Sequence, residues 1–225
     1  MMRRAMVAAI SCLSFGLLYS DGPDQIEPRE DSLLLPHVGA APDRWAETDA
    51  VSGQAEPNPR LDDPEVQALL SQLELRHTGL SREEIHELAR TVVGESRRQE
   101  LEPDLVFAVM QVESSCYNFA VSSVGALGLM QIMPRTGESL ARKLNVDWRG
   151  PDTLFDPIVN VRLGIAYLKI LSDRYGSLPA ALAAYNWGPA RIDSRLRRGA
   201  ALPSKYVQQV LRVFDPPGSR LARRS

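Results

Sequence analysis

Apolar residues recur with the spacing of an α-helix through much of this chain, and this periodicity restricts the fold more than any other feature. Val66, Leu69, Leu70 and Leu73 fall at positions i, i+3, i+4 and i+7, and the same spacing returns in residues 85–92. No segment shows the alternation of apolar and polar residues that marks a strand, and no fixed repeat is visible. We therefore expect a mainly α fold.

Signals for helix ends divide this region into further helices. Ser81 and Glu84 have the spacing of a capping box, which predicts a helix start. Pro103 precedes the segment 105–112, which is apolar nearly all round and predicts a central, buried helix. The remaining helices are expected at 134–144, 156–176, 179–186, 189–197 and 204–214.

The first 20 residues have the character of an export signal. Two arginines precede an apolar run at residues 5–18, which is shorter than the roughly 20 residues of a membrane span. We expect residues 1–20 to act as a cleaved signal peptide or as an uncleaved N-terminal membrane anchor. The protein is then exported to the periplasm or cell envelope. Lipidation at Cys12 is less favoured, because its surroundings match a lipoprotein signal only loosely.

Composition changes along the chain and suggests its division. Residues 21–63 are rich in Pro, Asp, Glu, Gly and Ala without apolar periodicity, which is typical of a disordered linker. Residues 64–79 are expected to hold a preceding helix, residues 80–215 one domain, and residues 216–225 a disordered tail. A hydrophobic content of 44% in 225 residues is enough for one core.

The net charge and the absence of known binding motifs argue against a nucleic acid, a metal or a nucleotide as a ligand. The net charge of −2 arises from 28 acidic and 26 basic side chains, so nothing in it favours a nucleic acid. No Walker-type loop and no zinc-spaced Cys/His set is present, so we expect neither a metal nor a cofactor. Cys116 has no neighbouring histidine in the sequence, which favours a small buried thiol over a nucleophile.

Glu113 is the most unusual ionisable residue. It continues the helical spacing of Val106, Val109 and Met110, and so it extends an apolar stripe. Burial of a carboxyl group raises its pKa above the usual value of about 4.3, toward the range in which it can donate a proton near neutral pH. On position alone, a helix-terminal glutamate that faces solvent stays open as an alternative.

Three motifs occur in order along the chain, and this glutamate belongs to the first of them. They are Glu113-Ser114, the segment 122–134 with its Gly-Leu-Met-Gln-Ile-Met-Pro run, and Ala184-Tyr185-Asn186. Together they resemble the catalytic domain of the soluble lytic transglycosylases, which has a lysozyme-like helical fold. The resemblance covers the expected domain at 80–215.

The resemblance implies a role for each matching residue. Glu113 corresponds to the catalytic acid and base. Substrate binding is implied for Ser122, Gln131, Met133, Tyr185, Asn186 and Tyr206. Without the resemblance, Ser122 is equally well a turn residue, Met133 a packing residue and Tyr185 a core aromatic. Trp187 either stacks on a sugar ring or fills the core.

The implied reaction needs only one carboxylate. A lytic transglycosylase cleaves the β-1,4 bond between N-acetylmuramic acid and N-acetylglucosamine in peptidoglycan without water, and it leaves a 1,6-anhydromuramic acid end. Such an enzyme is a carbon–oxygen lyase that uses no metal. No Asp or Glu occurs between Glu113 and Glu138, which agrees with a single catalytic acid.

Two other functions remain open at this point. A lysozyme-type hydrolase would need a second carboxylate, with Asp147, Asp152, Asp156 and Asp173 as candidates. A non-catalytic peptidoglycan-binding module of a secretion apparatus would keep the groove without the chemistry. Beyond the glycan strands, the expected partners are a membrane, through the N-terminus, and other proteins of the cell-wall machinery.

Overall fold

The computed structural model describes residues 59–214. The expected signal peptide or anchor at 1–20, Cys12, the linker as far as residue 58 and the tail after residue 215 lie outside the described residues. Within them the expected mainly α fold is confirmed, because residues 59–214 contain eight α-helices and no strand. Two isolated bridges, Val121 with Leu127 and Leu127 with Ile132, are the nearest approach to sheet structure in this region.

The helices lie close to where the apolar periodicity predicts them. One element was not foreseen, the short 3-10 helix η2 at Pro151–Phe155, since five residues are too few to show a period. In chain order the α-helices are α2 Pro64–Leu73, α3 Arg82–Arg98, α4 Pro103–Ser114, α5 Pro134–Lys143, α6 Pro157–Tyr175, α7 Leu178–Trp187, α8 Pro189–Arg197 and α9 Lys205–Val213.

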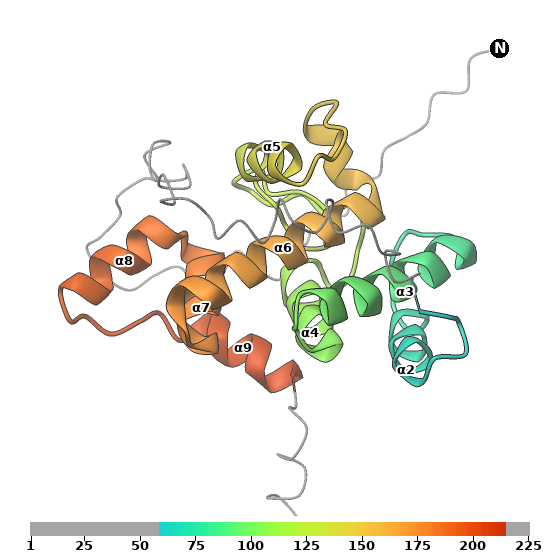
Figure 1. Cartoon of the computed structure of the whole chain (residues 1–225), viewed down its shortest axis with the longest axis horizontal. Coiled ribbons are helices and arrows are strands. Elements are labelled where there is room, and N and C mark those ends of the chain that lie inside the picture. Colours follow the sequence, from blue (N-terminus) through green and yellow to red (C-terminus); the bar gives the residue numbers. More distant parts are fainter. Residues whose placement is uncertain (1–58, 215–225) are drawn as a thin grey trace, which may run out of the picture.

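Helix α6 is the centre of the packing (Figure 1). It contacts α3 and α5 along one part of its length and α7 along another. Asp156 caps its first turn by accepting hydrogen bonds from the backbone of Ile158 and Val159. Gly176, with φ of 61°, ends it in the left-handed conformation that a residue with a Cβ avoids.

Helix α4 runs through the core, as its apolar sequence predicts. Its residues 105–110 are all buried, and it contacts α2 and α3 on one side and α9 on the other. The chain leaves this helix through Ser115 and Cys116, both with positive φ, and so reverses sharply after the glutamate that ends the apolar stripe. The C-terminal end of α4 therefore faces a folded-back loop.

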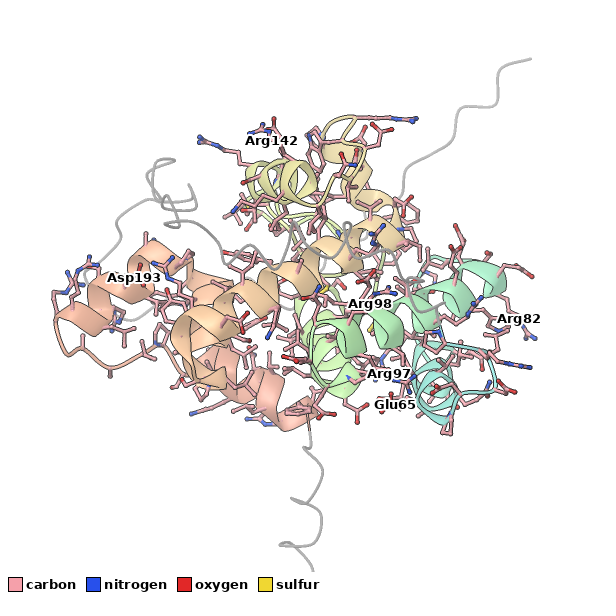
Figure 2. All side chains as sticks on the ribbon, in the orientation of Figure 1. Glu65, Arg82, Arg97, Arg98, Arg142 and Asp193 are labelled. Carbon is pink, nitrogen blue, oxygen red and sulfur yellow. The ribbon has the colours of Figure 1, made fainter. Side chains whose placement is uncertain are left out.

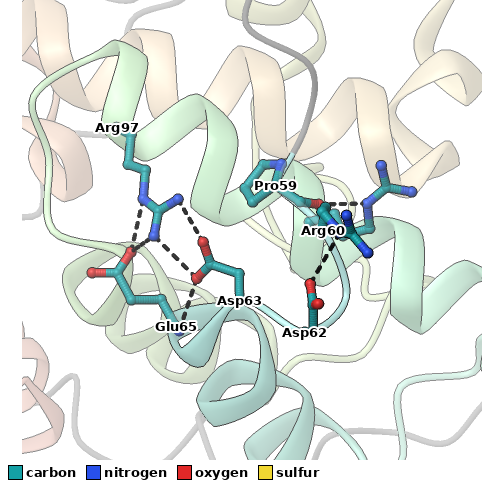
Figure 3. Close-up of polar contacts among 7 residues, drawn as sticks. Pro59, Arg60, Asp62, Asp63, Glu65 and Arg97 are labelled. Carbon is teal, nitrogen blue, oxygen red and sulfur yellow. Dashed lines mark hydrogen bonds and ion pairs between the residues drawn. The ribbon is translucent and has the colours of Figure 1, made fainter.

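The first described residues are tied to α3 (Figure 3). Asp63 caps α2 through Glu65, and both carboxylates pair with the guanidinium group of Arg97. The side chain of Arg90 donates to the carbonyl oxygen of Pro59 at 2.7 Å. Residues 59–63, the end of the expected linker, thus contact the helical domain.

Charged side chains cover the outside of the domain (Figure 2). The predicted capping box at the start of α3 is confirmed, since Ser81 and Glu84 exchange hydrogen bonds of 2.7 and 3.2 Å. None of the helices within residues 59–214 combines the length and apolar character needed to cross a membrane.

Candidate active site

Glu113 lies in the last turn of α4, where buried and exposed surfaces meet. Its side chain is half-buried, whereas the six residues from Leu105 to Met110 are buried. The next residue, Ser114, donates a hydrogen bond to the carbonyl oxygen of Leu129 at 2.7 Å. This bond fastens the glutamate to the loop that follows α4.

Burial gives the carboxyl group of Glu113 an unusual acidity. Desolvation raises its pKa from 4.5 to about 7, because the charged form loses water that the surrounding protein does not replace. A glutamate that faces solvent would keep its ordinary pKa, so the half-buried position and the raised pKa of Glu113 favour the buried carboxyl group over that alternative. At neutral pH the protonated and charged forms of Glu113 coexist, which suits a group that must give up a proton and take one back.

Within residues 59–214, Tyr206 at the beginning of α9 makes the one polar side-chain contact that changes the pKa of this carboxyl group. Its hydroxyl donates to Oε1 of Glu113 at 2.6 Å. The hydrogen bond favours the charged carboxylate and lowers the pKa of Glu113 against the larger effect of burial. Sequence analysis assigned Tyr206 to substrate binding, and the structure also places it directly on the catalytic candidate.

Tyr185, from α7, is a buried residue close to Glu113. Its hydroxyl donates to the carbonyl oxygen of Met130 at 2.9 Å, and its ring packs against Tyr167. Burial raises its pKa well above 10, and the charge of Glu113 is the next cause, which places the two side chains near each other. Tyr185 supports the loop behind the glutamate, and its buried hydroxyl is already occupied by a backbone group.

The loop between α4 and α5 carries three of the expected substrate-binding residues. Ser122 accepts a hydrogen bond from the backbone of Ala126 at 2.9 Å, as a turn residue does. The amide of Gln131, a residue with φ of 48°, donates to the carbonyl oxygens of Ala120 and Gly128. Met133 is half-buried and immediately precedes α5. These side chains shape the loop, and their contact with substrate stays a prediction.

Asn186 lies in the last turn of α7 and is exposed. No polar contact among residues 59–214 joins Asn186 or Met133 to Glu113. The structure therefore brings together Glu113, Tyr185 and Tyr206, with the loop of Ser122 and Gln131 beside them. Asn186 is at the edge of this group.

Asn160, which holds the loop in place, was not predicted from the sequence. This fully buried residue of α6 accepts from the backbone of Met130 and donates to the carbonyl oxygens of Leu127 and Leu154, at 2.8 to 3.0 Å. Gly128 has φ of +77°, and a Cβ there would lie 2.2 Å from Nδ2 of Asn160. The available signal was an asparagine beside Val161 in an apolar stripe, where a buried amide requires partners.

Among residues 59–214, no second acid contributes to the pKa of Glu113. Its pKa is set by burial and by Tyr206, and neither cause is another carboxylate. Three of the four candidates are committed elsewhere, since Asp147 pairs with Arg149, Asp156 caps α6 and Asp173 pairs with Lys169. Asp152 is exposed in η2.

The other reactive side chains of residues 59–214 do not form a second candidate centre. Cys116 is buried, and burial raises the pKa of its thiol to about 12, so it is a packing residue rather than a nucleophile. Within residues 59–214 no group of three or more His, Cys, Asp or Glu side chains is arranged to hold a metal ion.

The chain matches one protein family. Residues 91–207 match the family described as the transglycosylase SLT domain. The chain is 41% identical over 128 residues to the transglycosylase of Enterobacteria phage PRD1, covering 57% of this chain and 44% of that protein. It is 35% identical over 107 residues to the soluble lytic murein transglycosylase of Salmonella typhimurium, covering 47% of this chain and 17% of that one.

One solved structure to which the chain is similar is an inactive mutant of lytic transglycosylase Slt from Pseudomonas aeruginosa. The two chains are 34% identical with a TM-score of 0.46, and the match covers 56% of this chain and 20% of the other. This chain therefore spans less than half the length of the relatives named here.

Proposed function

The chain belongs to the SLT transglycosylase family, and we propose that it is a lytic transglycosylase that cleaves the glycan strands of peptidoglycan. Family membership agrees with the lysozyme-like helical fold expected from the motifs. The observation that carries the proposal is the half-buried carboxyl group of Glu113, whose pKa is about 7 and is not influenced by any second acid within residues 59–214. An ordinary glycosidase would require two carboxylates.

The proposed reaction uses Glu113 twice. Its protonated form gives a proton to the oxygen of the β-1,4 bond between N-acetylmuramic acid and N-acetylglucosamine, and the bond between C1 and that oxygen breaks. The resulting carboxylate takes the proton of the muramyl 6-hydroxyl while the oxygen of this hydroxyl bonds to C1. Glu113 is protonated again, a 1,6-anhydro ring has formed, and no water is consumed.

The surroundings of Glu113 support both steps. Burial keeps a fraction of the carboxyl protonated near neutral pH, as the first step needs. The Tyr206 hydroxyl, 2.6 Å away, stabilises the carboxylate that forms. Because the 6-hydroxyl is tethered to the reacting sugar, its attack has a high effective concentration and outcompetes water.

The proposed substrate implies a place in the cell. Peptidoglycan lies in the envelope, so we propose that the protein acts there. The export signal expected at residues 1–20, membrane attachment through it, and contacts with other cell-wall proteins belong to the same proposal. So does substrate binding by Ser122, Gln131, Met133 and Asn186.

Mass spectrometry of the digested products tests the function. Purified peptidoglycan treated with the protein is expected to release muropeptides that end in 1,6-anhydromuramic acid and resist borohydride. Products heavier by one water and reducible by borohydride would identify a lysozyme-type hydrolase instead. Strand binding without any released product would identify a non-catalytic binding module.

A further inference from the structure

A cluster of arginines on α8 carries positive charge that the domain does not neutralise. Its members, called here the basic cluster, are Arg191, Arg195, Arg197 and Arg198. None of the ion pairs within residues 59–214 includes them. The one acid in this segment, Asp193, is already bound by Arg174 and by the hydroxyl of Tyr175 at 2.8 Å.

Two of these arginines are held in fixed positions. The guanidinium groups of Arg191 and Arg195 lie over the ring of Trp187, at 5.3 and 5.8 Å from its centroid. Nε of Arg195 also donates to the carbonyl oxygen of Ala201 at 2.9 Å. Most N–H groups of both side chains stay available, so Arg191 and Arg195 present oriented donors rather than freely moving charges.

The basic cluster is one helix away from the candidate active site in the packing, because α8 contacts α7, the helix that carries Tyr185. Trp187 ends α7, two residues after Tyr185, and α9 with Tyr206 follows α8 in the chain. Figure 1 shows α8 at one end of the molecule, beyond α7, and Figure 2 shows Asp193 there. A ligand of the cluster would therefore lie beyond α7, outside the group formed by Glu113, Tyr185 and Tyr206.

We propose that the basic cluster binds carboxylate groups of the peptides attached to the glycan strand. This inference rests on the proposed function, because a peptidoglycan strand branches into short peptides that end in free carboxylates. A guanidinium group holds a carboxylate through two parallel hydrogen bonds. The cluster would thus favour strands that still carry their peptides over bare glycan.

The observations favour this ligand over an anionic lipid surface. A helix that lies on a membrane needs a broad apolar face beside its basic residues. Helix α8 has nine residues, and among them only Leu196 is a strongly exposed large apolar side chain. The Trp187 ring, which would otherwise enter the lipid, is covered by two guanidinium groups.

The test compares two forms of one substrate. Labelled soluble glycan strands are used with their peptides, and after an amidase has removed them. In the double variant Arg197→Gln/Arg198→Gln, which keeps the Trp187 stack, kcat/KM and binding by fluorescence anisotropy are expected to fall about fivefold on the peptide-bearing strands and to stay within about twofold on the bare ones. The loss should disappear in 1 M salt, where such contacts are screened.

A matched control removes the same charge elsewhere. Arg142→Gln/Arg149→Gln deletes two exposed arginines, and it should change neither substrate. Equal loss on both strands, no loss on either, or a loss confined to binding of phosphatidylglycerol vesicles would overturn the proposal. If the unaltered protein bound but did not cleave either strand, the proposed function would fail, and the binding comparison would still decide the role of the cluster.

Discussion

The hydroxyl group of Tyr206 lies 2.6 Å from Oε1 of Glu113, although 93 residues separate the two in the chain. One residue ends α4 and the other begins α9, and the packing of these helices brings them together. Burial raises the pKa of the carboxyl group and this hydrogen bond lowers it, with burial the larger effect. The balance between the two sets the pH range in which the site can act.

Glu113→Gln is expected to abolish most turnover. Glutamine keeps the size of the side chain but cannot release and retake a proton, so kcat should fall at least about 100-fold. Binding of glycan strands should remain within about threefold, because no charge that holds the sugar is removed. Release of muropeptides and strand binding are measured in parallel, and near-normal turnover would remove Glu113 from the mechanism.

Tyr206→Phe is expected to move the pH profile. In the unaltered protein the first step needs protonated Glu113, so kcat/KM should fall about tenfold per unit above pH 7. Without the hydroxyl the charged form of Glu113 loses its hydrogen bond, the pKa rises, and the alkaline limb moves to higher pH. Maximal activity should fall about tenfold, since the carboxylate formed after the first step is less stable. An unmoved alkaline limb would contradict this role of Tyr206.

Glu113→Gln is also expected to change the pH dependence of stability. The folded protein holds the Glu113 proton with a pKa of about 7, against 4.5 for an exposed glutamate. The protonated Glu113 therefore contributes to the free energy of unfolding in full below pH 4.5. This contribution, about 3 kcal/mol, is lost as the pH rises through 7. Relative to the unaltered protein, the variant should gain up to this amount between pH 4 and pH 8. Urea unfolding at both pH values measures it.

Gly128→Ala is expected to destabilise the domain by more than about 3 kcal/mol. The new Cβ would lie 2.2 Å from Nδ2 of Asn160 and 2.4 Å from the carbonyl oxygen of Leu154, both fixed by hydrogen bonds. Gly125→Ala is the matched control, because its φ of +84° is similar but a Cβ there meets no atom within 4 Å. It should cost only about 1 kcal/mol. Similar losses in thermal unfolding would show that backbone strain alone is responsible.

Removing the N-terminal residues should distinguish two boundaries. A protein that begins at Pro59 keeps the Asp63 cap and the pairs with Arg97, and it should unfold cooperatively with the midpoint of the full chain. A protein that begins at Pro64 loses them and should be less stable by about 1 to 2 kcal/mol. Arg60→Gln in the full chain serves as the control, because its pair with Asp62 is exposed. Equal midpoints for both truncations would show that the cap contributes nothing.

Much of the fold followed from local patterns in the sequence. Apolar spacing and capping residues predicted every α-helix within residues 59–214, because both act between neighbours in the chain. Glu113 was found in the same way, as a carboxylate in an apolar stripe. The contact between Tyr206 and Glu113 was not foreseen, since it depends on how α9 packs on α4. Asn160 was missed for the same reason, because its partners lie up to 33 residues away.

The resemblance implied substrate binding for several side chains whose polar groups are bonded to the backbone in the folded chain. Tyr185 lies near Glu113, but its hydroxyl is bonded to the backbone of Met130. The polar groups of Ser122 and Gln131 likewise make backbone contacts within their own loop. Such roles depend on which groups remain free after folding, and residue identity alone does not reveal that.

The docking of α9 has a consequence for when the protein becomes active during its own synthesis. Helix α9 is the last described helix, and it supplies Tyr206 and contacts α4. Before residues 205–213 have emerged and packed, Glu113 lacks this cover and its tyrosine partner. Without the cover of α9 the carboxyl group would regain water and its pKa would fall toward 4.5, so Glu113 in a nascent chain, or in one shortened by proteolysis at this end, would be a poor proton donor at neutral pH. The proposed activity would then begin only after residues 205–213 have been translated and have packed against α4.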